Sequence, residues 1–303
     1  EEPPTRARAR RLLGQAASPR CWQRSAPPPK HFSGARGRPS TARAPRGAMA
    51  SAIGGTRAQH EAQEEEILAQ VRSRPPIGSR EHGLSGLEEE LKANEGFSRK
   101  IPGMISKYSG LRRVRGDGNC FFRAFMFRYF EVLLSDRTER ERALEVVKSS
   151  LEYLLIAGYE SVSIESFVEF TEDMLENLEK MSLADLEEVF SDEGESDYLV
   201  WFARLVSAGF LKSNADRFVP FLPFDFVTVQ DFCAKEVEPM GKECEQLQII
   251  ALSEYLGVRV QIEYLDSGDS ATTSTHTFGP EESSDDISIC LLYRPSHYDI
   301  LYL

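Results

Sequence analysis

The sequence predicts an α+β fold in which a helical region comes first and a small, mostly antiparallel sheet comes last. Apolar residues recur at helical spacing from residue 120 to residue 256, whereas the clearest alternation of apolar and polar residues, at 258–264, lies near the C-terminus. The order of these patterns differs from the strand–helix alternation that gives a parallel sheet. We therefore expect a helical lobe packed on a small sheet within residues 108–303.

The expected elements of residues 108–303 follow one another along the chain with short connections. Each is assigned from its apolar periodicity, its capping residues or its closing glycine. They are a lead-in strand at 111–114, helices at 120–134, 138–157, 167–178, 182–190, 198–211, 229–235 and 247–256, a strand at 258–264, and a terminal hairpin at 287–302.

Composition sets residues 1–48 apart from the rest of the chain. They carry ten Arg and one Lys against two Glu, a net charge of +9, and they hold eight of the sixteen prolines. Such a segment cannot bury a core, so we expect it to be disordered. It is a non-native extension ahead of Met49, an organelle transit peptide, or a nucleic-acid-binding arm. The abrupt change of composition at Met49 favours the first interpretation.

Residues 49–107 are expected to form a partly helical N-terminal arm outside the compact domain. Residues 61–71 are acidic and helix-prone, and the Pro-Pro pair at 75–76 interrupts them. Leu84, Leu87 and Leu91 then mark a second short amphipathic segment. Because short helices are marginal in water, a solvated arm is the favoured interpretation.

Overall composition excludes several classes of protein. The hydrophobic share is 41%, and no stretch of twenty apolar residues could cross a membrane. The five cysteines are widely spaced without a Cys-x-x-Cys pair, so neither a zinc site nor a disulfide framework is indicated. We expect a monomer without metal or other cofactor, acting on neither membrane nor nucleic acid. A reducing compartment is expected, the cytoplasm first and the nucleus as an alternative.

Cys120 stands between a turn and a core helix. Asp117, Gly118 and Asn119 are turn-forming residues, and the apolar run behind them has neither Gly nor Pro up to Leu134. Free N–H groups and the positive end of the dipole at a helix N-terminus favour a thiolate there. The same N–H groups could hold a developing oxyanion. Cys120 is therefore a candidate nucleophile, and a buried structural cysteine is the plainer alternative.

His297 is the best-placed base among the five histidines. It lies on the second strand of the terminal hairpin, after a turn that contains Pro295. Because side chains alternate along a strand, His297 and Asp299 face the same side. Asp299 could then orient the imidazole and stabilise its cation. The residues alone leave catalysis and two unrelated structural residues open.

The same residues resemble a known family. Asp117-Gly-Asn-Cys120 followed by Phe-Phe-Arg-Ala-Phe is similar to the nucleophile motif of the ovarian-tumour (OTU) cysteine proteases. The ending Leu292-Tyr-Arg-Pro-Ser-His297-Tyr-Asp-Ile-Leu-Tyr302 resembles the histidine motif of its otubain branch. Ser196-Asp-Tyr-Leu-Val200 and Val237-Glu-Pro-Met240 also look like otubain segments. The resemblance spans residues 108–303.

The resemblance implies a papain-like protease fold and a catalytic set. Cys120 would be the nucleophile, His297 the general base and acid, and Asp299 the residue that orients His297. Asp117 would shape the oxyanion loop. Its alternative role is to cap the Cys120 helix through its carboxylate.

The resemblance also implies a substrate and partners. Otubains cleave the isopeptide bond between the C-terminal glycine of ubiquitin and a lysine, so ubiquitin, polyubiquitin and ubiquitin-conjugating enzymes are the expected partners. Two alternatives remain, a non-catalytic regulator that binds ubiquitin and conjugating enzymes, and a cysteine protease or acyltransferase with other substrates. Candidate ubiquitin contacts lie on the helix that matches the family's distal ubiquitin site, with a core role as the alternative: Asp197, Tyr198, Trp201, Phe202 and Leu205.

Overall fold

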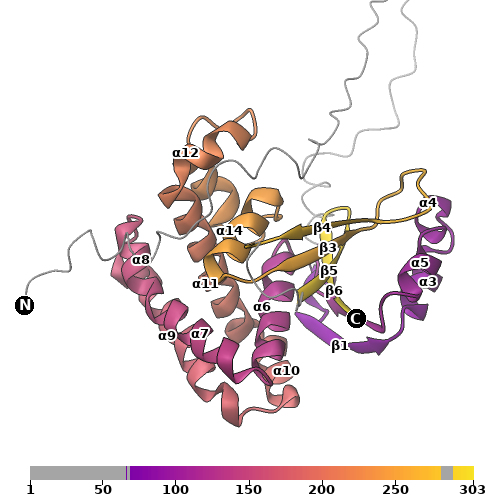
Figure 1. The fold of residues 1–303 in the computed structure, drawn as a ribbon, viewed down its shortest axis with the longest axis horizontal. Helices are drawn as coiled ribbons and strands as arrows, with labels where there is room; N and C mark the ends of the chain where they lie inside the picture. Colours follow the sequence, from indigo (N-terminus) through magenta and orange to yellow (C-terminus); the bar gives the residue numbers. More distant parts are fainter. Residues whose placement is uncertain (1–65, 67–68, 281–288) are drawn as a thin grey trace, which may run out of the picture. The chain divides into compact units, whose positions relative to one another are not determined.

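The computed structural model describes residues 66, 69–280 and 289–303, which belong to one compact unit, Glu61–Leu303 (Figure 1). The predicted disorder of residues 1–48 and the first part of the predicted arm lie outside the described residues. In the described part of the chain, no helix combines the length and the apolar character that crossing a membrane requires.

A six-stranded sheet forms one half of the fold, and its order is β1-β2-β6-β5-β3-β4. The pair β3–β5 is parallel, and the other four pairs are antiparallel, which confirms the mostly antiparallel sheet. The strands are β1 (Ile77–His82), β2 (Gly110–Val114), β3 (Val260–Tyr264), β4 (Ser274–Phe278), β5 (Ile289–Arg294) and β6 (His297–Tyr302).

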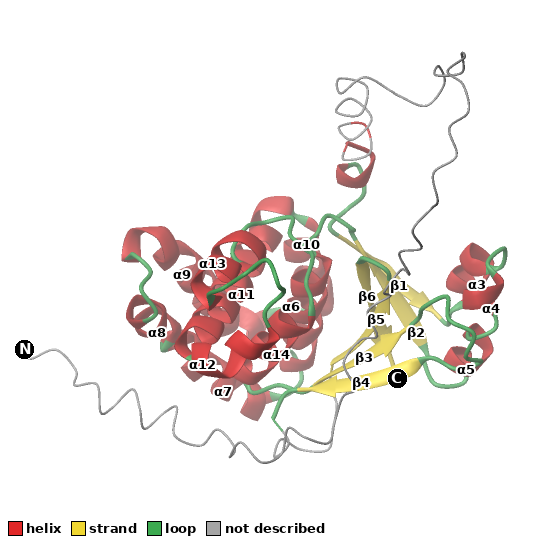
Figure 2. Cartoon of the chain, turned by 90° about the horizontal axis from the view of Figure 1, so that it is seen from above, coloured by secondary structure: helices red, strands yellow, loops and turns green. Residues whose placement is uncertain are grey.

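A helical lobe packs on one face of this sheet, which confirms the α+β class (Figures 1 and 2). Two helices organise it, because the buried helix α6 begins at the site and the long helix α11 runs past it. The helices of the lobe are α6 (Cys120–Leu133), α7 (Arg137–Lys148), α8 (Ser150–Ile156), α9 (Ser161–Asn177), α10 (Leu183–Ser191), α11 (Glu193–Ser213), α12 (Ala215–Phe218), α13 (Val229–Phe232) and α14 (Gln246–Leu256), with short 3-10 turns at Leu178–Lys180 and Val219–Phe221 and a π-helical turn at Cys233–Val237.

Three short helices cover the other face of the sheet: α3 (Ser85–Leu91), α4 (Glu95–Ser98) and α5 (Ile101–Ile105) (Figure 2). Leu87 and Ile101 from these helices are fully buried against Leu111 of β2 and Leu292 of β5. The neighbouring residue Leu291 faces the helical lobe instead, as the alternation of a strand requires. Both faces of the sheet are therefore buried.

The predicted boundary at residue 108 is wrong, because residues 77–107 are part of this fold. Strand β1 pairs with β2 along the sheet edge, and α3–α5 bury their apolar faces on the sheet. The sequence signal of β1 was weak because only Ile77 of its six residues is buried. Strand β4 was also missed, and the helix expected at 138–157 is two helices, α7 and α8.

The terminal hairpin is confirmed. Strands β5 and β6 pair antiparallel, and Arg294 is opposite His297, so Pro295 and Ser296 form a two-residue turn. Ser296 takes the positive φ of 62° that such a tight turn needs. This turn places His297 at the start of β6, at the end of the sheet nearest the N-terminus of α6.

Candidate active site

Cys120 is the first residue of α6 and is almost fully buried. The loop before it, residues 117–119, is called the oxyanion loop below. In this loop the Asn119 N–H donates to Asp117 Oδ1 at 2.9 Å. The backbone N–H groups of Gly118 and Cys120 have no acceptor within the described residues, so they are free to bind an anion. The predicted position of Cys120 at a helix N-terminus is confirmed.

His297 lies between Cys120 and Asp299. Its Nε2–H donates to Asp299 Oδ1 at 2.9 Å, and its imidazole hydrogen-bonds with the Cys120 side chain. Gly116 leaves room for the ring, since a Cβ atom at residue 116 would lie 3.2 Å from His297 Nδ1. Burial disfavours the imidazolium, but Asp299 and Cys120 outweigh burial and raise the pKa of His297 to about 9. A charged imidazole therefore faces Cys120 at neutral pH.

Asp299 is fully buried and fully bonded. Besides the contact with His297, its Oδ1 accepts the Val114 N–H at 3.0 Å, and its Oδ2 accepts from Arg294 at 2.8 Å. Burial raises the pKa of this carboxyl, but the hydrogen bond and charge of His297, the charge of Arg294 and the Val114 N–H together hold it below its usual value. Asp299 is therefore a fixed anion that orients His297.

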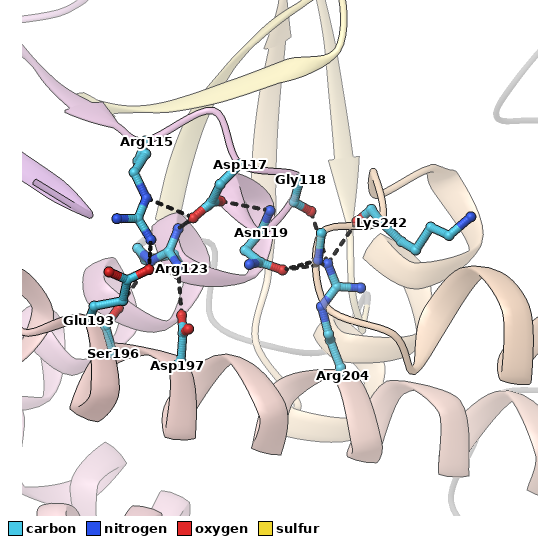
Figure 3. Close-up of polar contacts among 11 residues, drawn as sticks. Arg115, Asp117, Gly118, Asn119, Arg123, Glu193, Ser196, Asp197, Arg204 and Lys242 are labelled. Carbon is cyan, nitrogen blue, oxygen red and sulfur yellow. Dashed lines mark hydrogen bonds and ion pairs between the residues drawn. The ribbon is translucent and has the colours of Figure 1, made fainter. Parts of the chain in front are cut away.

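Asp117 is held by two arginines (Figure 3). Its carboxylate accepts from Arg115 Nε and from Arg123 Nη1, each at 2.9 Å. Arg123 also binds Ser196 and Asp197 of α11, which ties the oxyanion loop to that helix. Burial raises the pKa of Asp117, yet the charge and hydrogen bonds of Arg123 dominate with the other donors and lower it. The carboxylate thus fixes the loop through the Asn119 N–H.

The five predicted ubiquitin contacts on α11 separate into two groups. Phe202 is fully buried and Leu205 nearly so, which makes both core residues and makes the contact interpretation wrong for Phe202. Asp197 binds Arg123 at 2.9 Å and serves the oxyanion loop. Tyr198 and Trp201 are partly exposed and pack against the Phe167 ring of α9.

A small cavity of about 80 Å³ opens beside Cys120. Two carboxylates and three hydroxyls line it, so it suits a polar or cationic chain passing the thiol. Its lining residues are Cys120, Glu243, Cys244, Glu245, Tyr293, Ser296 and Tyr298. Sequence reasoning missed residues 243–245, although they follow the otubain-like segment that ends at Met240. Within the described residues, no group of three or more His, Cys, Asp or Glu is arranged to bind a metal ion.

Two apolar surface features also escaped the sequence analysis. The first is an exposed patch in the segment between α12 and α13, formed by Val219, Phe221, Phe224 and Val227, with Phe224 93% exposed. Large exposed apolar side chains in one short segment indicate a protein contact. The second is a groove of about 590 Å³ between α9, α11 and residues 234–239, lined by Tyr159, Ser163, Ile164, Phe167, Trp201, Leu205, Ala234, Glu238 and Pro239.

Comparison with known proteins identifies the family. Residues 69–303 match the family model described as Peptidase C65 Otubain. The chain belongs to the otubain family. This otubain is 41% identical to human "Ubiquitin thioesterase OTUB1" over 243 residues, which cover 80% of this chain and 88% of that protein. It is also 41% identical to the Arabidopsis thaliana "OVARIAN TUMOR DOMAIN-containing deubiquitinating enzyme 1", covering 79% of this chain and 83% of that protein.

Solved structures agree with this assignment. The otubain resembles "The structure of a ceOTUB1 ubiquitin aldehyde UBC13~Ub complex" with a TM-score of 0.74 and 29% identity, covering 79% of this chain and 98% of that chain. It also resembles "The structure of h/ceOTUB1-ubiquitin aldehyde-UBCH5B~Ub" with a TM-score of 0.74 and 28% identity, covering 81% of this chain and 97% of that chain. The predicted resemblance to otubains and the OTU fold are confirmed.

Proposed function

We propose that this otubain is a deubiquitinating cysteine protease that hydrolyses the isopeptide bond between the C-terminal glycine of ubiquitin and a lysine. The observation that carries the proposal is the chain of contacts Cys120–His297–Asp299 at the start of α6. Nucleophile, base and orienting anion stand in the order that thiol proteases need. Related proteins named ubiquitin thioesterase supply the substrate class.

The first half of the reaction forms an acyl-enzyme. The Cys120 proton passes to His297, and the thiolate sulfur attacks the carbonyl carbon of the ubiquitin C-terminal glycine. The carbonyl π electrons move to oxygen, and the free N–H groups of Gly118 and Cys120 bind that oxyanion. The tetrahedral intermediate then collapses, the C–N bond breaks, and the imidazolium of His297 protonates the leaving lysine amine.

The second half releases ubiquitin. His297, now neutral, removes a proton from a water molecule, which attacks the thioester carbon. The C–S bond breaks, and the proton returns from His297 to the Cys120 sulfur. Asp299 holds the same imidazole orientation through both halves, because its carboxylate is fixed by the Val114 N–H and by Arg294. The thiol and imidazole are thereby regenerated.

Two surfaces support ubiquitin as the substrate. Glu243 and Glu245 line the cavity beside Cys120 and offer negative charge to the arginine-containing tail of ubiquitin. The exposed apolar patch of Val219, Phe221, Phe224 and Val227 could hold the folded part of the same ubiquitin. We also expect the enzyme to work as a monomer in a reducing compartment, where Cys120 stays a thiol.

The experiment that tests the proposal uses a panel of diubiquitins of all linkages. Wild-type protein should cleave at least one linkage, and Cys120→Ser should cleave none, because the serine hydroxyl is a far weaker nucleophile at neutral pH. Phe224→Ser should raise KM with little change in kcat, since the side chain is remote from the bond that breaks. Equal cleavage by wild type and Cys120→Ser would reject Cys120 as the nucleophile.

A second candidate function is the binding of ubiquitin-conjugating enzymes without cleavage. The apolar groove between α9 and α11 favours it, because a groove of this size suits a protein partner. Solved OTUB1 complexes contain ubiquitin-charged UBC13 or UBCH5B. Ala234 is an exposed residue of the groove, so Ala234→Arg should weaken binding of a charged conjugating enzyme and leave diubiquitin cleavage unchanged. Unaltered binding would move the partner to another surface.

A further inference from the structure

Arg204 lies in the middle of α11 and is fully buried, yet its acceptors all belong to loops at the active site (Figure 3). Its Nη1 donates to the Val237 carbonyl at 2.9 Å. Its Nη2 faces three oxygens, the Gly118 carbonyl at 2.9 Å, Asn119 Oδ1 at 2.8 Å and the Lys242 carbonyl at 2.7 Å. One guanidinium thus joins the oxyanion loop to residues 237–242, called the facing segment below.

The two segments that Arg204 joins are in direct backbone contact. Gly118 has a φ of +77°, and a Cβ atom at this residue would lie 2.1 Å from the Gly241 carbonyl oxygen. The Gly241 N–H donates to Asn119 Oδ1 at 2.9 Å, so the Asn119 carboxamide bridges Arg204 and the facing segment. Both Gly118 and Gly241 are conformationally permissive, which means that something outside the loop must select the orientation of its peptide planes.

Arg204 is an expensive way to stabilise a helical lobe. Its four acceptors are all uncharged, and within the described residues its Nε has no acceptor. Burial lowers the pKa of its guanidinium to about 10, against the opposing charges of Cys244, Asp117 and Cys120, so it remains a cation at neutral pH. A buried cation on neutral partners costs stability compared with an apolar side chain. Its contribution is therefore sought in the geometry that it imposes.

We propose that Arg204 is a positioning residue that holds the oxyanion loop against the facing segment, so that the Gly118 and Cys120 N–H groups point at the developing oxyanion. The planar fork of arginine is needed because acceptors on two segments must be held at once. The Phe122 ring, 4.5 Å from the guanidinium carbon, fixes the plane of that fork from below the nucleophile. This inference rests on the proposed protease function.

Two substitutions separate charge from shape. Arg204→Lys keeps the charge and loses the fork, and Arg204→Gln loses both. Each should lower kcat on diubiquitin by about 100-fold with KM changed less than about threefold, because the oxyanion exists only in the transition state. Arg142→Gln is the matched control. Arg142 binds the Leu256 carbonyl and the Tyr129 hydroxyl, and Tyr129 is about 13 Å along α6 from Cys120, so kcat should stay at the wild-type value.

Two ubiquitin probes distinguish loop positioning from general damage. A C-terminal aldehyde forms a tetrahedral adduct with an oxyanion, whereas a C-terminal propargyl amide gives a vinyl thioether without one. The Arg204 variants should lose affinity for the aldehyde in parallel with kcat, and react with the propargyl probe within about fivefold of wild type. Equal losses with both probes, or wild-type kcat in Arg204→Lys, would overturn the proposal.

Amide hydrogen exchange tests the same inference without any activity. Residues 117–119 and 237–242 should exchange faster in both Arg204 variants, and should be unchanged in Arg142→Gln. If the wild type cleaves no ubiquitin conjugate, the proposed function fails, and exchange still decides whether Arg204 holds the two segments. Unchanged exchange in both segments would reject the positioning role, including for a variant whose overall stability is lower.

Discussion

Glu90 of α3 and Asp299 of β6 bind the same two arginines, Arg113 and Arg294. Arg294 donates to Glu90 at 2.6 Å and to Asp299 at 2.8 Å, while Arg113 lies 2.8 Å from Glu90 and 3.7 Å from Asp299. The residue that orients His297 is thereby linked to a helix that sequence reasoning assigned to a solvated arm. The N-terminal helices support the site as well as the sheet.

The two ends of this network should differ in importance. Glu90 is half-exposed, and such ion pairs are worth about 0–1 kcal/mol, so Glu90→Gln should lower kcat/KM by less than about fivefold. Arg294→Met should lower it far more, because it removes a direct charge partner from the fully buried Asp299. Initial rates on diubiquitin compare the two variants. A larger loss in Glu90→Gln than in Arg294→Met would contradict this order.

Replacing Asp299 by Asn tests the orienting role. The carboxamide keeps the shape but removes the anion that raises the pKa of His297, so kcat should fall by about 10²- to 10⁴-fold. The high-pH limb of the rate profile should also move to lower pH, because the imidazolium then loses its proton more easily. A pH–rate profile of wild type and Asp299→Asn provides the measurement. An unchanged high-pH limb would separate that limb from His297.

The raised pKa of His297 also predicts how folding stability depends on pH. Its pKa moves from 6.5 to about 9 on folding, so the native state binds the proton more tightly than the unfolded chain. The stabilisation is complete below pH 6.5 and is lost as pH rises through 9, with a total of about 3 kcal/mol at most. Urea unfolding of wild type and His297→Gln between pH 6 and pH 10 measures the difference. Parallel curves would contradict the shift.

The catalytic constellation was accessible to sequence reasoning because its parts are local. A turn before an apolar helix placed Cys120, and a two-residue hairpin turn placed His297 and Asp299 on one face of a strand. Arg204 carried no such signal, since its acceptors come from segments more than thirty residues away in the sequence. Strand β1 was missed for a related reason, because backbone pairing with β2 fixes it, and apolar alternation does not.

The contact between Gly118 and Gly241 gives the sharpest steric prediction. A Cβ atom at residue 118 would lie 2.1 Å from the Gly241 carbonyl oxygen, and the backbone there has a φ of +77°. Gly118→Ala must therefore separate the oxyanion loop from the facing segment, and kcat should fall by about 100-fold or more.

Gly158→Ala is the matched control for this substitution. Residue 158 also has a positive φ, +97°, but a Cβ atom there would meet nothing within 4 Å. Both variants should lose about 1 kcal/mol of stability from backbone strain, whereas only Gly118→Ala should lose activity. Thermal unfolding and diubiquitin cleavage, measured on the same preparations, compare them. Full activity in Gly118→Ala would mean that catalysis does not require the two segments to stay in contact.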